Sequence, residues 1–160
     1  MFKRFTVVLV IIIAIVSLCS CKSEPELSEK DEKVATVGLY ALAETLGQYS
    51  ENDSYKGVSF VISQDNSTGV FSFNNVSIPT NLTEIDSSWG TQTILLNGEL
   101  VLKYEAPPAS YPRTATINIS FTFGGKTHTM EVIEKETGIS SRKITYFKFD
   151  GTEYPASTIQ

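Results

Sequence analysis

Most of this sequence lacks cysteine. The two cysteines, Cys19 and Cys21, both lie near the start of a 160-residue chain. The part that follows them has no thiol with which to build a disulfide, a zinc site or a cysteine nucleophile. Its stability must come from packing, and 41% hydrophobic residues are enough for the core of one domain.

Clusters of basic residues are also lacking. The chain has 13 Lys and Arg against 18 Asp and Glu, a net charge of −5, and loss of Lys3 and Arg4 with a leader would leave it more acidic. The other basic residues are dispersed, as Lys56 and Lys103 illustrate. Because nucleic-acid binding draws on clustered Lys and Arg that displace counterions from phosphates, this class of function is excluded.

Signatures of catalysis are scarce. The sequence contains no nucleophile-elbow, zinc-protease, P-loop or dinucleotide-binding pattern. His128 is the only histidine, and its place on an apolar strand face favours a neutral, hydrogen-bonded structural residue over a general base. The carboxylates of Glu131, Glu134 and Glu136 are interpreted as a solvated strand edge and not as a glycosidase pair. We expect no catalytic residue, no metal site and no cofactor.

The first twenty residues have the layout of a signal peptide. A basic start, Met1–Arg4, precedes an apolar run from Phe5 to Leu18. A helix that spans a bilayer needs about 20 apolar residues, and this run is shorter, so cleavage is favoured over permanent insertion.

The run ends in Leu18-Cys19-Ser20-Cys21, which resembles the lipobox of bacterial lipoproteins. The resemblance covers only the leader. It implies cleavage between Ser20 and Cys21, a diacylglycerol on the Cys21 sulfur and, in many bacteria, an acylated amino group. Two or three acyl chains would give durable membrane anchoring.

Two alternatives to modification of Cys21 stay open. Cys19 stands where a small residue is commoner, and Cys19 itself could be modified, although Leu18 is bulky for that cleavage site. The leader could also be an ordinary secretory signal with incidental cysteines. Lys22 stands where many inner-membrane lipoproteins carry Asp, and this resemblance points to the outer membrane or the cell surface.

The chain divides into a signal peptide at 1–20, an acidic tether at 21–33 and a single domain at 34–160. A helix is predicted from Glu29 to Gln48, with Ser28 opening a capping box and Gly47 as a stop signal. One apolar stripe recurs at helical spacing and is expected to pack on a sheet. It comprises Ala35, Leu39, Leu42, Leu46 and Tyr49.

Strand patterns begin after the helix. An antiparallel pair is predicted from 57–63 and 69–78, joined by a turn at 64–68. Asn97-Gly98 is predicted to be a two-residue hairpin turn between strands at 93–96 and 99–102, with Leu96 opposite Glu99.

Two further hairpins follow. The turn at Gly124-Gly125 would pair Phe121 with His128, and the turn at Asp150-Gly151 would pair Phe147 with Tyr154. One helix followed by seven or eight strands predicts a mainly β fold, either an antiparallel β-sandwich or an open, barrel-like sheet.

The function predicted from these patterns is that of a non-enzymatic binding module anchored to a membrane by lipid, in the bacterial envelope. Trp89 and Tyr111, in the two longest loops, could form an aromatic platform for a sugar or a peptide. A protein, a glycan or a small apolar ligand is a possible partner. The alternative is a structural role in an envelope complex, through a strand edge or through the helix at 35–49.

Overall fold

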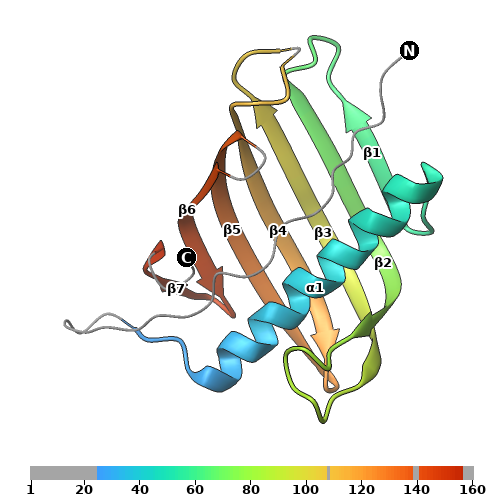
Figure 1. Cartoon of the computed structure of the whole chain (residues 1–160), viewed down its shortest axis with the longest axis vertical. Coiled ribbons are helices and arrows are strands. Elements are labelled where there is room, and N and C mark those ends of the chain that lie inside the picture. The colour runs from blue at the N-terminus through green and yellow to red at the C-terminus, as the bar shows by residue number, and fades with distance from the viewer. Residues whose placement is uncertain (1–24, 108, 139–140, 157–160) are drawn as a thin grey trace.

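The computed structural model describes residues 25–107, 109–138 and 141–156. These residues form one helix and seven strands, and the strands make a single antiparallel sheet in the order of the chain (Figure 1). The elements are α1 (Glu29–Asn52), β1 (Val58–Ile62), β2 (Thr68–Asn81), β3 (Thr91–Tyr104), β4 (Arg113–Phe123), β5 (Lys126–Gly138), β6 (Ser141–Phe149) and β7 (Thr152–Tyr154). The predicted mainly β class is confirmed. Of the two architectures, the open sheet is the one observed.

The helix begins where the capping box predicts. Ser28 is the N-cap residue, and its Oγ accepts a hydrogen bond from the Asp31 backbone N–H at 3.1 Å. Residues 29–33, assigned to the tether, therefore belong to α1. The predicted stop at Gly47 is wrong, because α1 continues to Asn52 and ends at Asp53, which has a φ of 52°. A single glycine weakens a helix without ending it when the rest of the turn is packed.

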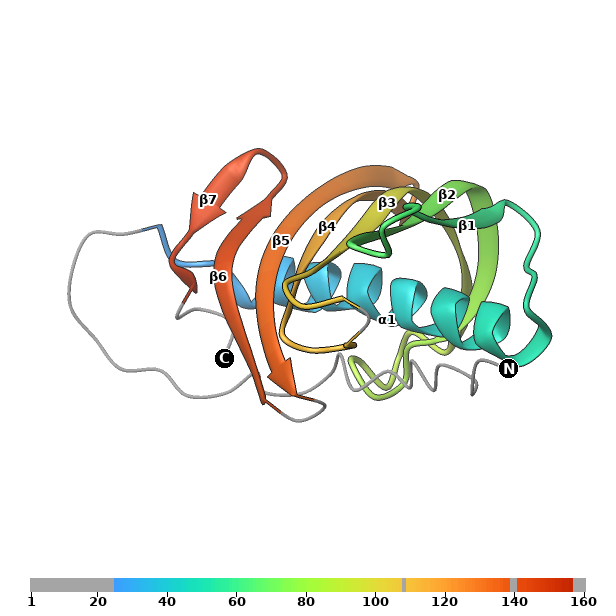
Figure 2. The same ribbon diagram turned by 90° about the horizontal axis from the view of Figure 1, so that it is seen from above.

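The sheet curves around α1, which lies along its concave face (Figure 2). The predicted stripe does pack on the sheet: Ala35, Leu42 and Leu46 are buried within one apolar core that β2, β3 and β4 also line. The approach is close at Gly38, where any Cβ would overlap the ring of Phe121 on β4. The missing side chain of Gly38 leaves room for this ring.

The predicted hairpin at Asn97-Gly98 is wrong. Both residues lie in the middle of β3, a continuous strand of 14 residues, and Gly98 pairs with Phe73 on one side and Ile119 on the other. The positive φ that the pair allows is present, since Gly98 has a φ of 118°. This positive φ bends the strand and does not turn the chain. A Cβ at Gly98 would clash with the Asn118 carbonyl oxygen.

A bulge in β2 matches this bend. The register between β2 and β3 shifts between Phe73 and Val76, and Asn75 takes a φ of 48°. The Asn75 backbone N–H donates to Asn97 Oδ1 at 2.8 Å. Bulges and glycine bends let long strands coil, which allows β2 and β3, about 46 Å each if straight, to wrap the helix.

The other predicted hairpins are confirmed in position and register. Phe121 pairs with His128 across the Gly124-Gly125 turn, and Phe147 pairs with Tyr154 across Asp150-Gly151. The connection between β1 and β2 covers residues 63–67, one residue earlier than the turn predicted at 64–68.

Candidate functional site

Cys21, the predicted lipidation site, lies outside the described residues, and so does the signal peptide. Among the residues that are described, no helix combines the length and apolar character needed to cross a bilayer. The predicted anchor stays a prediction.

The structure does not bring Trp89 and Tyr111 together. Trp89 lies in the loop before β3 and Tyr111 in the loop after it, so the full length of β3 separates them. Trp89 is partly buried against the core, with its ring 4.8 Å from that of Phe123. Tyr111 stacks under the Arg113 guanidinium, 4.8 Å from the ring centroid. The two residues cannot form one aromatic platform.

Five polar residues gather at the end of the sheet where β4 begins and β5 ends, and we call them the polar end cluster. They are Tyr104, Arg113, Glu134, Glu136 and Arg142. Four of them oppose one another in a row across four strands, since Tyr104 pairs with Arg113, Arg113 with Glu136 and Glu136 with Arg142.

The predicted solvated edge of carboxylates is therefore wrong for Glu134 and Glu136. Glu136 is 3% exposed and accepts a hydrogen bond from Arg113 Nε at 2.6 Å, while Glu134 is 7% exposed with Arg142 Nε 4.0 Å away. Burial and the neighbouring charge of Glu136 raise the pKa of the Glu134 carboxyl. Only Glu131 is half-exposed, beside Lys148.

His128 lies at the opposite end of β5. Its ring stacks between Phe121 and Phe149 at centroid distances of 5.5 and 5.6 Å, and Nδ1 lies 2.8 Å from Asp150 Oδ2. Burial opposes ionisation of Asp150, but hydrogen bonds from the Thr129 backbone and His128 hold its pKa below its usual value. The hydrogen-bonded structural role predicted for His128 agrees with this setting.

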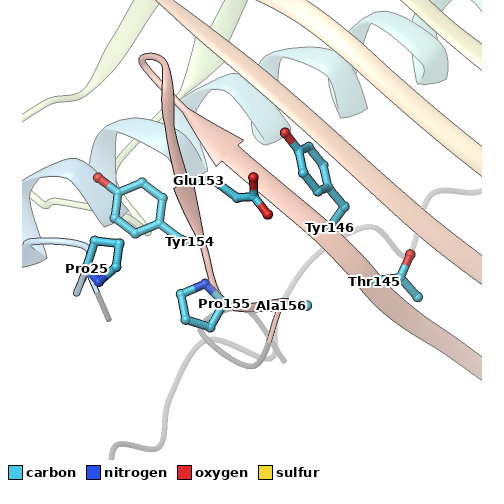
Figure 3. Close-up of a pocket in the computed structure, with 7 residues that line it drawn as sticks. All are labelled: Pro25, Thr145, Tyr146, Glu153, Tyr154, Pro155 and Ala156. Carbon is cyan, nitrogen blue, oxygen red and sulfur yellow. The ribbon is translucent and has the colours of Figure 1, made fainter. Parts of the chain in front are cut away.

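A shallow groove lies beside β7 (Figure 3). It has a volume of about 310 Å³, and its lining residues are Pro25, Thr145, Tyr146, Glu153, Tyr154, Pro155 and Ala156. It is open to solvent, and none of the buried charged residues lines it. No group of His, Cys, Asp and Glu in the described part of the chain is arranged to hold a metal ion.

The edge strand β1 is the most distinctive surface of the molecule. Four large hydrophobic residues are exposed in the described chain, and three of them are consecutive in β1: Phe60 at 37%, Val61 at 65% and Ile62 at 44%. Phe60 and Ile62 lie on the concave face, where the Phe60 ring packs 4.4 Å from that of Phe71. Val61 lies on the outer face. The apolar concave face therefore continues to the edge of the sheet and is left open there.

The backbone of β1 also presents hydrogen-bonding groups outward. Ser63 N–H donates to the Thr68 carbonyl and Asn74 N–H to the Gly57 carbonyl, both at 2.8 Å. Because bonded and non-bonded pairs alternate in an antiparallel ladder, the peptide groups of Phe60 and Ile62 point away from β2.

The two edges of the sheet differ in how they are protected. At the β7 edge, the strand is only three residues long, carries the exposed Glu153 and is followed by Pro155. Shortness, charge and proline are the usual protections of an edge. The β1 edge is longer, at five residues, and Val58–Ile62 contains no charge, no proline and no bulge.

No protein-family model, no curated protein and no solved structure matches the chain. Its function therefore has to be argued from its own residues.

Proposed function

We propose that the protein is a lipid-anchored, non-enzymatic binding module of the bacterial cell envelope that binds a protein partner through β1. The observation that carries the proposal is the run Phe60-Val61-Ile62, exposed on both faces of an unprotected edge strand. Such an edge is an aggregation hazard that soluble proteins normally avoid. Its presence supports a role in binding.

Strand addition is the binding mode that suits this edge. An extended segment of a partner would bond to the outward peptide groups of Phe60 and Ile62, which supply affinity that is independent of side chains. The exposed side chains of Phe60 and Val61 would then select the partner's residues on the two faces of the sheet.

The filled interior supports a protein partner over a small apolar ligand. A carrier of small ligands encloses them in a concave site. Here α1 occupies the concave face, and 24 buried hydrophobic residues form one core cluster. The loss of the joint platform of Trp89 and Tyr111 also removes the main argument for a glycan.

The environment of His128 supports a non-enzymatic role. The only histidine of the chain is 7% exposed, lies between two phenylalanine rings and bonds to Asp150. A general base needs hydrogen-bond reach to a substrate proton, and a stacked, buried imidazole suits packing better.

The envelope location rests on the lipobox resemblance at Cys21, with the outer membrane or the cell surface as the expected place. Residues 22–24 would serve as a short tether, since Pro25 already lines the groove beside β7 and Leu27 packs against the core. Their composition, Lys, Ser and Glu, is typical of solvated linkers.

Site-specific photocrosslinking in living cells tests the binding role. Val61 is replaced by benzoylphenylalanine in the full chain, and the matched control carries the same residue at Leu95, which is 42% exposed but lies inside the sheet on β3. We expect a discrete protein adduct from position 61 and none from position 95. Equal labelling at both positions, or none at either, would overturn the proposal.

The same experiment separates the alternative role, that of a structural component of an envelope complex. A fixed component would give the adduct in nearly all molecules, whereas a binding module would give an adduct whose yield changes with the supply of its partner.

A further inference from the structure

We propose that the partner at the β1 edge is a second copy of this chain, and that the two β1 strands pair antiparallel with Phe60 opposite Phe60 of the second copy. This inference rests on the proposed binding role of β1 and names the occupant of that edge. The pairing would join two seven-stranded sheets into one.

The backbone pattern of β1 is self-complementary about Phe60. The outward-facing residues are Val58, Phe60 and Ile62, evenly spaced on either side of the middle one. The Val58 N–H already donates to the Tyr55 carbonyl at 3.0 Å, so Val58 offers only its carbonyl oxygen to a second strand. In a two-fold arrangement Phe60 meets Phe60 of the second copy, and Val58 meets Ile62. Every outward residue then lies opposite another outward residue, which an antiparallel ladder requires.

The side chains fit the same register. On the concave face, Phe60 and Ile62 of each copy would extend the apolar surface across the junction and cover side chains that are now 37% and 44% exposed. On the outer face, Val61 would lie opposite Ser59. No charged residue occurs in the strand, so pairing two copies brings no like charges together in spite of the acidic chain.

Charges next to the strand are complementary in this register. Lys56 precedes β1 and Asp65 follows it, so the antiparallel arrangement brings the turn with Lys56 alongside the turn with Asp65 of the second copy. Hydrogen bonds from Ser63 and Ser67 lower the pKa of Asp65 to about 2, which keeps this carboxylate charged. Two such contacts would form, one at each end of the pair.

Membrane anchoring makes so small a contact sufficient. Five residues per copy bury much less than the area of a stable soluble dimer. Two copies held on one membrane by the proposed lipid at Cys21 meet at a raised effective concentration, which converts a weak contact into a populated dimer.

Disulfide trapping tests the register. In the proposed pair the Phe60 α-carbons are about 5.5 Å apart, within the range that a disulfide spans. Phe60→Cys in the full chain, oxidised in native membranes, is expected to give a covalent dimer of twice the chain mass. Ser59→Cys combined with Val61→Cys should also crosslink, whereas Val61→Cys alone should not, because its counterpart is displaced along the strand.

Matched controls make the result decisive. Ser72→Cys places an exposed thiol on β2, one strand away from the edge, and the unsubstituted chain reports any background from its own cysteines. Crosslinking of Ser72→Cys as strong as that of Phe60→Cys would overturn the proposal, as would efficient crosslinking by Val61→Cys alone.

A charge substitution supplies the second test. Ile62→Lys buries a charge in the paired edge and is expected to lower dimer formation about tenfold, whereas Leu95→Lys should leave it unchanged. Thermal unfolding of both variants checks that they fold. A position-61 photoadduct with a different protein, together with no Phe60→Cys dimer, would overturn the second copy as occupant and leave the binding role intact. No adduct of any kind would overturn both.

Discussion

At the residue scale, the polar end cluster shows that the face of the strand on which a charged residue lies decides whether its side chain is buried. His128, Met130 and Val132 face the core, so Glu134 and Glu136 on the same strand must face it too. Burying these carboxylates is costly unless they are paired, and Arg113 supplies the pair for Glu136. Single substitutions in the cluster are therefore expected to change the free energy of unfolding strongly, some lowering it and others raising it.

Arg113→Met is expected to lower the free energy of unfolding by about 3–5 kcal/mol, because it leaves the Glu136 carboxylate buried without its partner. The double variant Arg113→Met, Glu136→Leu should recover most of that loss, since it removes both charges together. Urea unfolding of the parent, the two single variants and the double variant measures the coupling. A double variant no more stable than Arg113→Met would show that the pair is not the source of the effect.

Glu134→Gln is expected to raise stability at neutral pH. The pKa of Glu134 is raised in the folded state, so protonation of its carboxyl stabilises the fold. This contribution is fully present below the unfolded-state pKa of 4.5 and is lost as the pH rises through the folded-state pKa. Glutamine keeps the shape and removes the charge. Urea midpoints at pH 4 and pH 8 should show a gain at the higher pH only. Glu131→Gln, at a half-exposed position, is the control and should show no such gain.

At the element scale, α1 contains two glycines in different settings. Gly47 has nothing within 4 Å of the position that a Cβ would take, whereas a Cβ at Gly38 would overlap the Phe121 ring. The first glycine only weakens the helix, and the second allows the helix to reach the sheet.

Gly47→Ala should therefore stabilise the protein by about 0.5–1 kcal/mol, through the lower backbone entropy of the unfolded chain. Gly38→Ala, in the same helix, should destabilise it by about 1–3 kcal/mol because of overpacking. Thermal or urea unfolding checks both. Changes of the same sign in the two variants would contradict this account of the helix–sheet contact.

The strands show where local patterns are informative and where they are ambiguous. Gly124-Gly125 and Asp150-Gly151 act as turns, as predicted, whereas Asn97-Gly98 bends a continuous strand. All three allow positive φ, and the difference lies in the neighbouring strands. Gly98 lies between β2 and β4, where its missing Cβ leaves room for the Asn118 carbonyl.

The exposed edge could have been found in the sequence. Phe60, Val61 and Ile62 are consecutive apolar residues that break the alternation of a half-buried strand. In a sheet built only from hairpins, the first strand lies at an edge unless the sheet closes on itself. That last condition depends on curvature, which no local pattern reports.

At the scale of the whole molecule, the proposed anchor divides the chain into a lipid, a short tether and one domain. Cys21→Ser should abolish lipid attachment, because the thioether needs the Cys21 sulfur, and should move the protein from the membrane fraction to the soluble fraction. Mass spectrometry of the parent should find an N-terminus at Cys21 that carries two or three acyl chains. An unmodified Cys21, or a start elsewhere in the chain, would contradict the anchor.

The sequence by itself determined the features whose causes are local: the capped start of α1 at Ser28, its apolar stripe, two hairpin turns with their registers, and the mainly β class. The tertiary structure decided whether Asn97-Gly98 turned or bent the chain, that Glu134 and Glu136 were buried with Arg113, and that Trp89 and Tyr111 lay apart. These outcomes depend on which strands become neighbours, and such contacts join residues far apart in the chain. For β1, the residues made the strand apolar, and the open curvature of the sheet left it exposed.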